Sequence, residues 1–401
     1  MNIYRARWIV PVAQPPIENG WVSVEHGRVL AVGSGRAEWP ATDLGDVALL
    51  PAFINAHTHL ELSWMAGRVA PAVSMPLWVR ALMAERAHAP TAAEVGRAVT
   101  ETIATAMASG TAVFGDITNT LAAVPPLEAS RADAVVFREL IGFSVPRPAD
   151  LVAGAWTDLD AIGAMDASRL RTSVVAHAPY SVSPALFSAI ADAKRHTPLA
   201  VHVGESPEEM EFLQTGRGPF RDLLERLGVW TTDWRVPACG PIEYLERRGY
   251  LGDGMLAVHG THLSEADLVR LRNAGGCLVT CPRSNAWVGG GAPDASRFYR
   301  SGVPVAVGTD SLASAPSLHM TDELAALRRA APDVSAARLI DSATRVGARA
   351  LGFEADYGSI QAGMRSVFAT VAIPTVVTDV EEYIVGGDVD AAAHVRLVRA
   401  D

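Results

Sequence analysis

Short apolar segments with strand character alternate with helical patterns through the middle of this 401-residue chain. Such alternation is typical of repeated βα units, which build a parallel sheet covered by helices. There are eight such apolar segments, which is the number of strands in a (β/α)8 barrel. They are residues 48–56, 112–116, 134–140, 172–177, 199–203, 255–259, 277–280 and 304–309. We therefore expect a (β/α)8 barrel as the central unit, with α/β fold class.

Local signals for helix ends support these βα units. Thr91 and Glu94 have the spacing of a capping box, and Gly110 follows apolar residues that recur every four positions. Ser183 and Pro184 supply a cap and a first-turn proline for a second helix. Each of these helices leads into one of the expected strands, as the repeat requires.

The two ends of the chain have a different pattern. Residues 1–50 and 355–401 contain short alternating segments separated by turn signals, which indicates hairpins. We expect both ends to meet as one small β-sandwich domain beside a barrel that spans residues 51–354. The interval at about 206–253 is too long for a plain βα connection, and insertions of this kind serve as lids or binding walls.

Composition excludes several classes of protein. The net charge is −10 without any basic run that could follow a phosphate backbone, so we expect no nucleic acid partner. The apolar stretches are shorter than the roughly 20 residues of a membrane span, and the first residues lack a signal-peptide pattern. Three cysteines argue against a disulfide framework, and Cys277 and Cys281 lack the other ligands of a usual zinc site. We expect a soluble, cytoplasmic protein, and its alanine- and leucine-rich helices would suit a homodimer.

Polar side chains stand at the carboxyl ends of the expected strands, where a parallel barrel gathers its functional groups. His57 and His59 are one residue apart on an extended chain, so both imidazoles point to the same side and can reach one metal ion. An HxH pair alone is weak evidence, and an isolated buried histidine is more often a packing residue. The combination with further strand-end residues makes a metal site the better interpretation. These residues are His177, His202, His259 and Asp310.

Glu205 follows His202 by three residues and can face the same cavity as a proton carrier. The alternative for Glu205 is a solvated loop acid. Glu208, Glu209 and Glu211 have the pattern of a charged first helical turn, and we expect no chemistry from them.

Five segments resemble the amidohydrolase superfamily, and within it the purine and pyrimidine deaminase branch. They are residues 50–59, 177–181, 202–206, 281–285 and 308–311, and the tail at 358–363 is similar to the return into that family's small β domain. The resemblance implies a distorted (β/α)8 barrel of the metal-dependent hydrolase type, with one divalent metal ion. The implied ligands are His57, His59, His202 and Asp310. We expect zinc, with iron as the alternative, because imidazole and carboxylate ligands suit both ions.

A narrower resemblance is to the aminodeoxyfutalosine deaminases, carried by residues 59–63, 205–213 and 308–314. It implies hydrolysis of a C–N bond in a heterocyclic amine, namely 6-amino-6-deoxyfutalosine to 6-deoxyfutalosine and ammonia in menaquinone biosynthesis. One alternative is another substrate, such as adenosine, methylthioadenosine, S-adenosylhomocysteine or a nucleobase. Others are an amidase or chlorohydrolase with the same metal centre, and a non-catalytic metal-binding protein.

The expected mechanism uses Glu205, His259 and Asp310 as catalytic residues. A bound divalent cation lowers the pKa of a water molecule towards ~7. Glu205 would then protonate the ring nitrogen, His259 would orient the attacking water, and Asp310 would pass the proton of that water to the leaving amine. Glu205 must carry a proton when the substrate arrives, so we expect its surroundings to raise its pKa.

We expect substrate contacts from residues beside the strand ends, with a small heterocyclic amine and water as the partners. The candidates are His177, Glu61, Arg138, Glu139, Arg283 and Asn285. Each arginine could bind a carboxylate bidentately, but a structural ion pair at the barrel rim is an equal alternative. Trp64, Trp78 and Trp287 could stack on a heterocycle, with packing as their alternative role.

Overall fold

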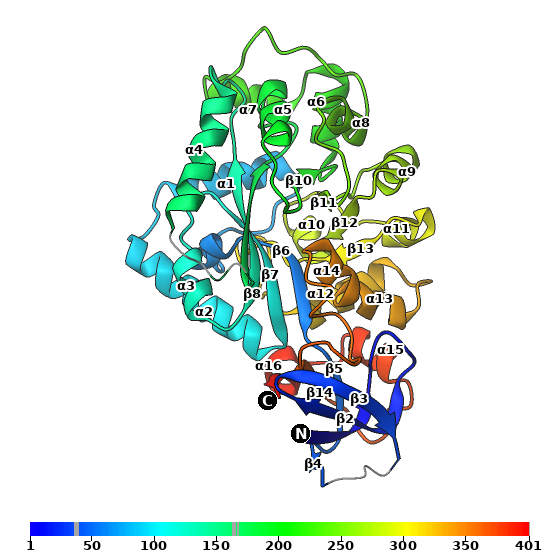
Figure 1. Ribbon diagram of the computed structural model, residues 1–401. Helices are drawn as coiled ribbons and strands as arrows, with labels where there is room; N and C mark the ends of the chain where they lie inside the picture. The colour runs from blue at the N-terminus through cyan, green and yellow to red at the C-terminus, as the bar shows by residue number, and fades with distance from the viewer. Residues whose placement is uncertain (36–39, 163–165, 167, 401) are drawn as a thin grey trace.

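The structure is a computed structural model that describes residues 1–35, 40–162, 166 and 168–400. Within these ranges, eight parallel strands occupy the centre of the molecule (Figure 1). One four-stranded sheet contains β6 (Phe53–Thr58), β7 (Thr111–Thr118), β8 (Asp133–Leu140) and β9 (Leu170–Ala176). The other contains β10 (Ala200–Val203), β11 (Leu256–His259), β12 (Cys277–Thr280) and β13 (Val305–Val307).

The two parallel sheets meet along both of their edges. At one seam the amide of His202 donates to the carbonyl oxygen of His177 at 2.9 Å, which places β10 beside β9. At the other seam the amides of Thr309 and Asp310 donate to the carbonyl oxygen of His57 at 3.0 and 3.1 Å. The eight strands therefore follow one another in a ring, which is consistent with the expected barrel type.

Helices cover the outside of this ring, and a short 3-10 helix, η1 (Leu60–Met65), follows β6. The first group is α1 (Met75–Arg86), α2 (Ala92–Ala108), α3 (Val124–Ala129), α4 (Pro148–Ala161) and α5 (Pro184–Asp192). The second group is α6 (Pro207–Thr215), α7 (Pro219–Arg226), α8 (Pro241–Arg247), α9 (Glu265–Asn273) and α10 (Pro282–Trp287). The third group is α11 (Ala295–Ser301), α12 (Met320–Ala330), α13 (Ala336–Ser342) and α14 (Arg345–Ala350). No helix in the described ranges is both long enough and apolar enough to cross a membrane.

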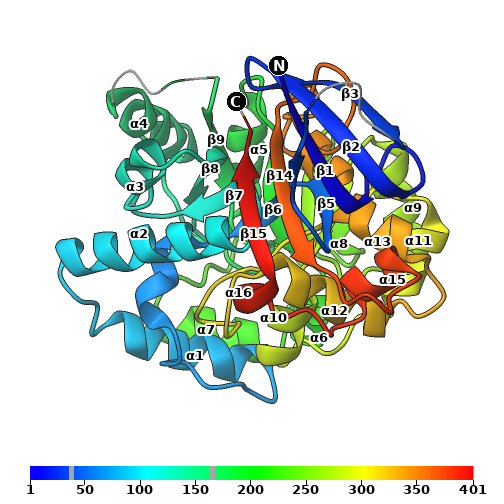
Figure 2. The same ribbon diagram turned by 90° about the horizontal axis from the view of Figure 1, so that it is seen from below.

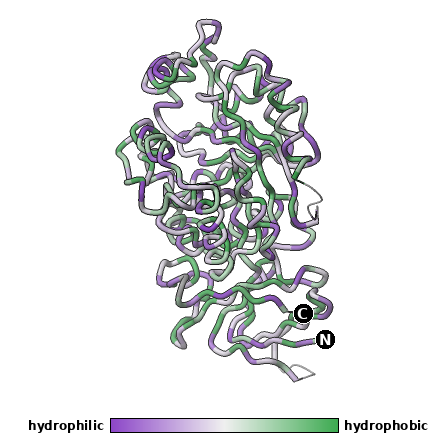
Figure 3. Tube along the Cα trace, turned by 90° about the vertical axis from the view of Figure 1, so that its left-hand side faces the viewer, coloured by the Kyte–Doolittle hydropathy of each residue, from purple (hydrophilic) through white to green (hydrophobic). Residues whose placement is uncertain are grey.

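Both ends of the chain join one sheet below the barrel, with α15 (Val380–Val385) and α16 (Ala391–His394) beside it (Figures 1 and 2). Its strands are β1 (Asn2–Ile9), β2 (Ile17–Glu25), β3 (Arg28–Ser34), β4 (Thr42–Asp43), β5 (Val47–Pro51), β14 (Val367–Ala372) and β15 (Val395–Arg399). In the described part of the chain their order is β15-β14-β5-β1-β2-β3, and β4 pairs with β1. The expected meeting of the termini is therefore present as a sheet, while its sandwich form stays a prediction. Hydrophobic residues run through the interior of both parts (Figure 3).

The expected strand at 48–56 is in fact two strands, so this boundary was wrong. β5 lies in the terminal sheet and β6 lies in the barrel. The change occurs between neighbouring amides: Ala52 donates to the carbonyl oxygen of Val367 at 3.2 Å, whereas Phe53 donates to that of Gly110 at 2.9 Å. An uninterrupted apolar run conceals this change because both strands are buried.

The helix signals around α2 and α5 are confirmed. Thr91 and Glu94 form the expected capping box, and Gly110 has a φ of 95°, which suits the turn into β7. The Ser183 side chain accepts from the amide of Leu186 at the start of α5.

Gly308 lies just beyond β13 and packs directly against the backbone of β6. A Cβ at this position would lie 2.7 Å from both the Cβ and the carbonyl oxygen of His57. No side chain fits that space, so only glycine allows the two strand ends to approach this closely. The position of His57 therefore depends on the small size of Gly308, which lies 251 residues later in the chain (308 − 57).

We expect Gly308→Ala to lower the free energy of unfolding by about 1–3 kcal/mol, because the added methyl group overpacks the seam. Gly96→Ala is the matched control, since nothing lies within 4 Å of its added Cβ and Gly96 sits inside α2. That change should raise stability by up to about 1 kcal/mol. Urea unfolding followed by circular dichroism measures both effects, and equal midpoints for the two variants would contradict the steric argument.

Candidate active site

Four of the expected residues converge at the carboxyl ends of the barrel strands. One ring nitrogen from each of His57, His59 and His202 lies within 4.8 Å of the other two. The Nε2 atoms of His59 and His202 are 3.2 Å apart. Oδ1 of Asp310 lies 3.5 Å from Nε2 of His59 and 3.9 Å from Nε2 of His57. Three imidazoles and one carboxylate thus face a common point.

The protonation state of these imidazoles suits a metal ion. Burial lowers the pKa of His59 to about 3 and lowers that of His57 well below its ordinary value, and neighbouring imidazoles add to the effect on His57. Both rings are therefore neutral at physiological pH. Nε2 of His57 is also buried without a hydrogen-bond partner among the described residues. An unpaired buried nitrogen is costly, and a divalent cation would satisfy it, so this donor set fits a metal ion.

Hydrogen bonds to the Nδ1 atoms fix the ring orientation of two strand-end histidines, His202 and His259. Nδ1 of His202 lies 2.9 Å from the carbonyl oxygen of His177, which can only accept, so Nε2 is left as the free lone pair. Oε1 of Glu139 lies 3.4 Å from the same Nδ1. Nδ1 of His259 lies 2.8 Å from Oδ1 of Asn285, so the free lone pair of His259 is also on Nε2. Contacts of this kind commonly set the tautomer of metal-site imidazoles.

Asp310 is held by two hydroxyl groups. Ser284 and Ser314 donate to Oδ2 at 2.5 and 3.0 Å, which leaves Oδ1 directed at the histidines. Burial raises the pKa of Asp310, but the neighbouring imidazoles and the Ser284 hydrogen bond outweigh it and hold the pKa below its ordinary value. Asp310 is therefore an anion at neutral pH.

Asp310 and His259 adopt a backbone conformation that non-glycine residues rarely use. Their φ angles are 59° and 74°, in the left-handed region. Such strain costs about 1–3 kcal/mol per residue and tends to persist where a side chain must be aimed at a functional site. The two residues leave their strands in unusual directions, and their side chains enter the same cavity.

Glu205 is buried at the edge of the histidine cluster. Its Oε1 lies 3.4 Å from Nε2 of His259. Burial raises the pKa of Glu205 well above its ordinary value, and the negative charges of Asp310 and Glu209 add to the shift. Burial therefore favours the protonated form of the Glu205 carboxyl group, which is the form that a proton donor needs.

Glu209 is a positioning residue that the sequence analysis missed. It is fully buried, and its two carboxylate oxygens accept from the amides of Gly204 and Glu205, each at 3.0 Å. Glu209 does lie in the first turn of α6, as expected, but it is buried and holds the backbone that carries Glu205. Ser206 and Glu209 have the same spacing as the capping pair before α2, and this signal could have identified it.

A cavity of about 550 Å³ opens onto these groups. The strand-end residues on its wall are His59, Glu139, His177, His202, Glu205, His259 and Asp310. The opposite wall is mostly apolar and comes from α1 and from α7 in the predicted insert. The insert therefore contributes to the wall of the cavity.

Two of the expected substrate contacts line this cavity, and four do not. His177 and Glu139 are on its wall. Glu61 is instead saturated by the turn after β7, because it accepts from the Thr118 hydroxyl at 2.7 Å and from the amides of Asn119 and Thr120 at 3.0 and 2.9 Å. Its expected role in substrate binding is not supported by this placement.

The two arginines proposed for substrate binding also have structural partners. Arg283 contacts Glu323 at 2.6 Å and Asp322 at 3.1 Å. Arg138 donates to the carbonyl oxygen of Asn119 and lies 3.7 Å from Asp158. Alternation along β8 sends Arg138 away from the cavity and its neighbour Glu139 towards it. Structural ion pairs, the alternative for both arginines, describe these contacts.

The remaining predicted residues have mixed positions. Asn285 does not line the cavity, and its Oδ1 instead contacts Nδ1 of His259. Trp78 lines the apolar wall, whereas Trp64 and Trp287 do not, and Trp287 donates to the carbonyl oxygen of Val69 at 3.1 Å. Asn119 directly follows β7, lines the cavity and donates to Oε2 of Glu139 at 2.9 Å, but it was not among the predicted residues.

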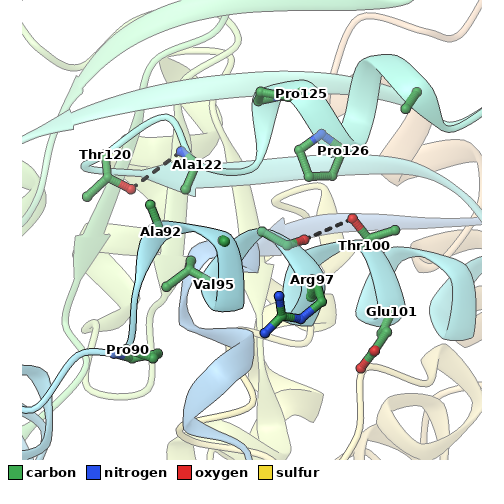
Figure 4. A pocket seen from close by; sticks show the side chains of 13 residues that line it. Pro90, Ala92, Val95, Arg97, Thr100, Glu101, Thr120, Ala122, Pro125 and Pro126 are labelled. Carbon is green, nitrogen blue, oxygen red and sulfur yellow. Dashed lines mark hydrogen bonds between the residues drawn. The ribbon is translucent and has the colours of Figure 1, made fainter.

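A larger hollow lies outside the barrel, between α2 and α3 (Figure 4). Its volume is about 950 Å³, and alanine and proline side chains make up much of its wall. Arg97 and Glu101 are the charged residues on that wall, which includes no histidine. This hollow lacks the groups for hydrolytic chemistry, so the barrel cavity is the candidate active site.

Comparison with known proteins identifies the family. The sequence profile of the Amidohydrolase family matches residues 48–391. The chain belongs to this family. The match spans the barrel and continues into the terminal sheet, and it agrees with the observed parallel α/β sheets. The family assignment makes the chain a hydrolase.

Characterised relatives of this family member include several deaminases. An aminodeoxyfutalosine deaminase of Deinococcus radiodurans is 29% identical over 358 residues, which cover 85% of this chain and 82% of the relative. A 5-methylthioadenosine/S-adenosylhomocysteine deaminase of Syntrophobacter fumaroxidans is 30% identical over 363 residues, with 86% and 78% covered. These relatives support a hydrolytic deaminase.

Solved structures show the same fold. The aminofutalosine deaminase of Helicobacter pylori in complex with methylthio-coformycin has a TM-score of 0.82 and 26% identity, and the match covers 96% of this chain and 95% of that one. An adenosine deaminase of Xanthomonas campestris with bound zinc has a TM-score of 0.79 and 25% identity, with 98% and 90% covered. A metal ion is thus present in a homologous structure.

We expect His59→Asn to weaken metal binding by roughly a hundredfold, because it removes an imidazole from the donor set. His196→Asn is the matched control, since His196 is exposed and lies outside the cluster. Elemental analysis after gel filtration should find about one metal ion per chain for the control and much less for His59→Asn. Equal metal content in both variants would exclude His59 as a ligand.

Proposed function

We propose that this chain is a metal-dependent deaminase of an aminated purine nucleoside, and that its substrate is 6-amino-6-deoxyfutalosine. The observation that carries the proposal is a buried Glu205, whose pKa is raised by burial, beside a cluster of neutral imidazoles on the wall of one cavity. Hydrolytic removal of an amine from a ring requires such a proton donor next to an activated water. The aminodeoxyfutalosine and aminofutalosine deaminases among the relatives support the substrate.

The proposed metal ligands are His57, His59, His202 and Asp310, and zinc is the proposed ion. When bound there, such a cation lowers the pKa of a water molecule towards ~7. Glu139 supports this set from behind, because its carboxylate lies beside Nδ1 of His202. A carboxylate in this position increases the basicity of the imidazole and fixes the ring.

The other catalytic steps belong to three side chains. Nε2 of His259 accepts a hydrogen bond from the attacking water and orients it towards the amine-bearing ring carbon. Glu205 donates its proton to the adjacent ring nitrogen as the new C–O bond forms. Asp310 takes one proton from the water and passes it to the amine, the C–N bond breaks, and ammonia leaves. The second proton of the water returns to Glu205, which restores the enzyme.

The extent of the catalytic unit is also a proposal. We infer that residues 51–354 carry the chemistry, that the insert at about 206–253 shapes the substrate side of the cavity, and that residues 1–50 and 355–401 form a separate small domain. In support, each strand-end residue of the site and both apolar walls of the cavity fall within 51–354.

A second candidate is another adenine nucleoside. The relatives named 5-methylthioadenosine/S-adenosylhomocysteine deaminase and adenosine deaminase favour it. Ammonia release from a panel of aminodeoxyfutalosine, adenosine, methylthioadenosine, S-adenosylhomocysteine, guanine and cytosine separates these candidates. Cyclic amides belong in the same panel, because their hydrolysis without deamination would contradict the proposal.

We expect Glu205→Gln to lower kcat about 10³-fold, because glutamine cannot donate a proton to the ring nitrogen. Metal content should stay unchanged. Glu211→Gln is the control, since Glu211 is an exposed acid on the next helix, α6. Initial rates of both variants measure the change in kcat, and elemental analysis measures their metal content. A Glu205→Gln enzyme with full turnover would exclude Glu205 as the proton donor.

A further inference from the structure

One helix, α1, contributes more residues to the apolar lining of the cavity than any other element. The cavity-lining residues of α1 are spaced by three or four positions, so they share a single face of the helix. They are Met75, Trp78, Val79, Leu82, Met83 and Arg86. Arg86 is the last residue of α1 and therefore ends this face with a positive charge.

A second helix contributes a matching apolar face. Phe220, Leu223 and Leu224 of α7 line the cavity at the same helical spacing, and Leu227 follows just beyond the helix. Phe220 also stacks on Tyr180, with ring centroids 3.9 Å apart. The cavity thus passes from a polar end at the strand ends to an apolar passage between two helices. An apolar group in this passage would gain roughly 25 cal/mol per Å² of buried surface.

Arg86 has an unusual place in this arrangement. It is the only lysine or arginine among the residues that line the cavity in the described part of the chain. Its side chain is exposed and makes no hydrogen bond or ion pair with the described residues, whereas the neighbouring Glu85 pairs with Arg68 at 3.2 Å. The guanidinium is therefore available to a ligand.

The charge of Arg86 also reaches the polar end of the cavity. Burial lowers the pKa of His177 to about 4, and the positive charge of Arg86 is the next cause. Burial raises the pKa of Glu139, while Arg86 is among the charges that oppose this shift. Arg86 and these strand-end residues line the same cavity, so one elongated ligand can contact both.

We propose that Arg86 determines specificity by binding a carboxylate at the far end of an apolar substituent on the nucleoside. This inference rests on the proposed function and narrows its substrate class. A guanidinium can bind a carboxylate through two parallel hydrogen bonds, and the apolar faces of α1 and α7 would cover the substituent between the two charges. Aminodeoxyfutalosine has this character, because its side chain ends in a benzoate. Methylthioadenosine ends in a neutral thioether and has no carboxylate that Arg86 could bind.

The other role open to Arg86 is purely structural. A positive charge in the last turn of a helix stabilises the helix dipole, whatever the substrate. That role predicts a change in stability and no change in substrate preference. A test must therefore compare substrates of equal shape and different charge.

The experiment compares aminodeoxyfutalosine with its methyl ester in the metal-loaded wild-type enzyme and in Arg86→Gln. We expect the wild-type enzyme to prefer the acid, and Arg86→Gln to raise KM for the acid about tenfold while leaving kcat and the ester unchanged. Arg86→Lys should keep part of the preference, because lysine keeps the charge without the bidentate geometry. Added salt should raise KM for the acid alone.

Arg80→Gln is the matched control, since Arg80 is an exposed arginine on α1 that does not line the cavity. It should leave the acid-to-ester ratio at the wild-type value. Equal KM changes for acid and ester in Arg86→Gln, or a wild-type enzyme without preference between them, would overturn the role of Arg86 while deamination stands. Failure of the wild-type enzyme to deaminate any purine nucleoside would overturn the proposed function, and this inference with it.

Discussion

The hydrogen bonds between the first and last barrel strands hold the whole site together. Thr58 and Asp310 are 252 residues apart in the chain, yet the Thr58 hydroxyl donates to the carbonyl oxygen of Asp310 at 2.7 Å. Asn55 reinforces the seam, because its side chain donates to the Thr309 hydroxyl at 2.7 Å and accepts from the Thr309 amide at 3.1 Å. Closing so long a loop costs chain entropy, and this buried polar network helps to offset it. Because the ring closes here, His57 and Asp310 face the same space.

The closed ring has an electrostatic consequence. Titratable groups are concentrated where water is largely excluded, so each takes the protonation state that its neighbours permit. Burial keeps His57 and His59 neutral and raises the pKa of Glu205, while neighbouring hydroxyl groups and imidazoles hold the pKa of Asp310 below its ordinary value. Divergence of this kind between neighbouring groups is how one site obtains both an acid and a base at one pH. The strained backbone of Asp310 is part of the same arrangement.

The sequence predicts this core well because its signals are local. Alternating apolar segments mark the strands, and polar residues that follow directly mark what stands at their ends. Predictions fail where a side chain's direction depends on distant partners: Glu61 is turned to the loop after β7 and Arg283 to α12. The spacing of Ser206 and Glu209 marks the start of α6, but it does not report the burial of Glu209, which depends on the packing of α6 against the strand-end turn. The boundary at 48–56 fails because two buried strands of different sheets have the same composition.

The division of the cavity between strands and helices has a consequence for how such enzymes diverge. The proposed reacting groups stand on the barrel, whose strands fix one another, whereas the proposed passage for the substituent is lined by α1 and α7, each from a connecting segment outside the ring. Substitutions along those two helical faces can retune the choice of ligand while the acid, the base and the ion keep their places. A few substitutions on two peripheral helices can therefore change which substrate is bound, while the chemical reaction stays the same.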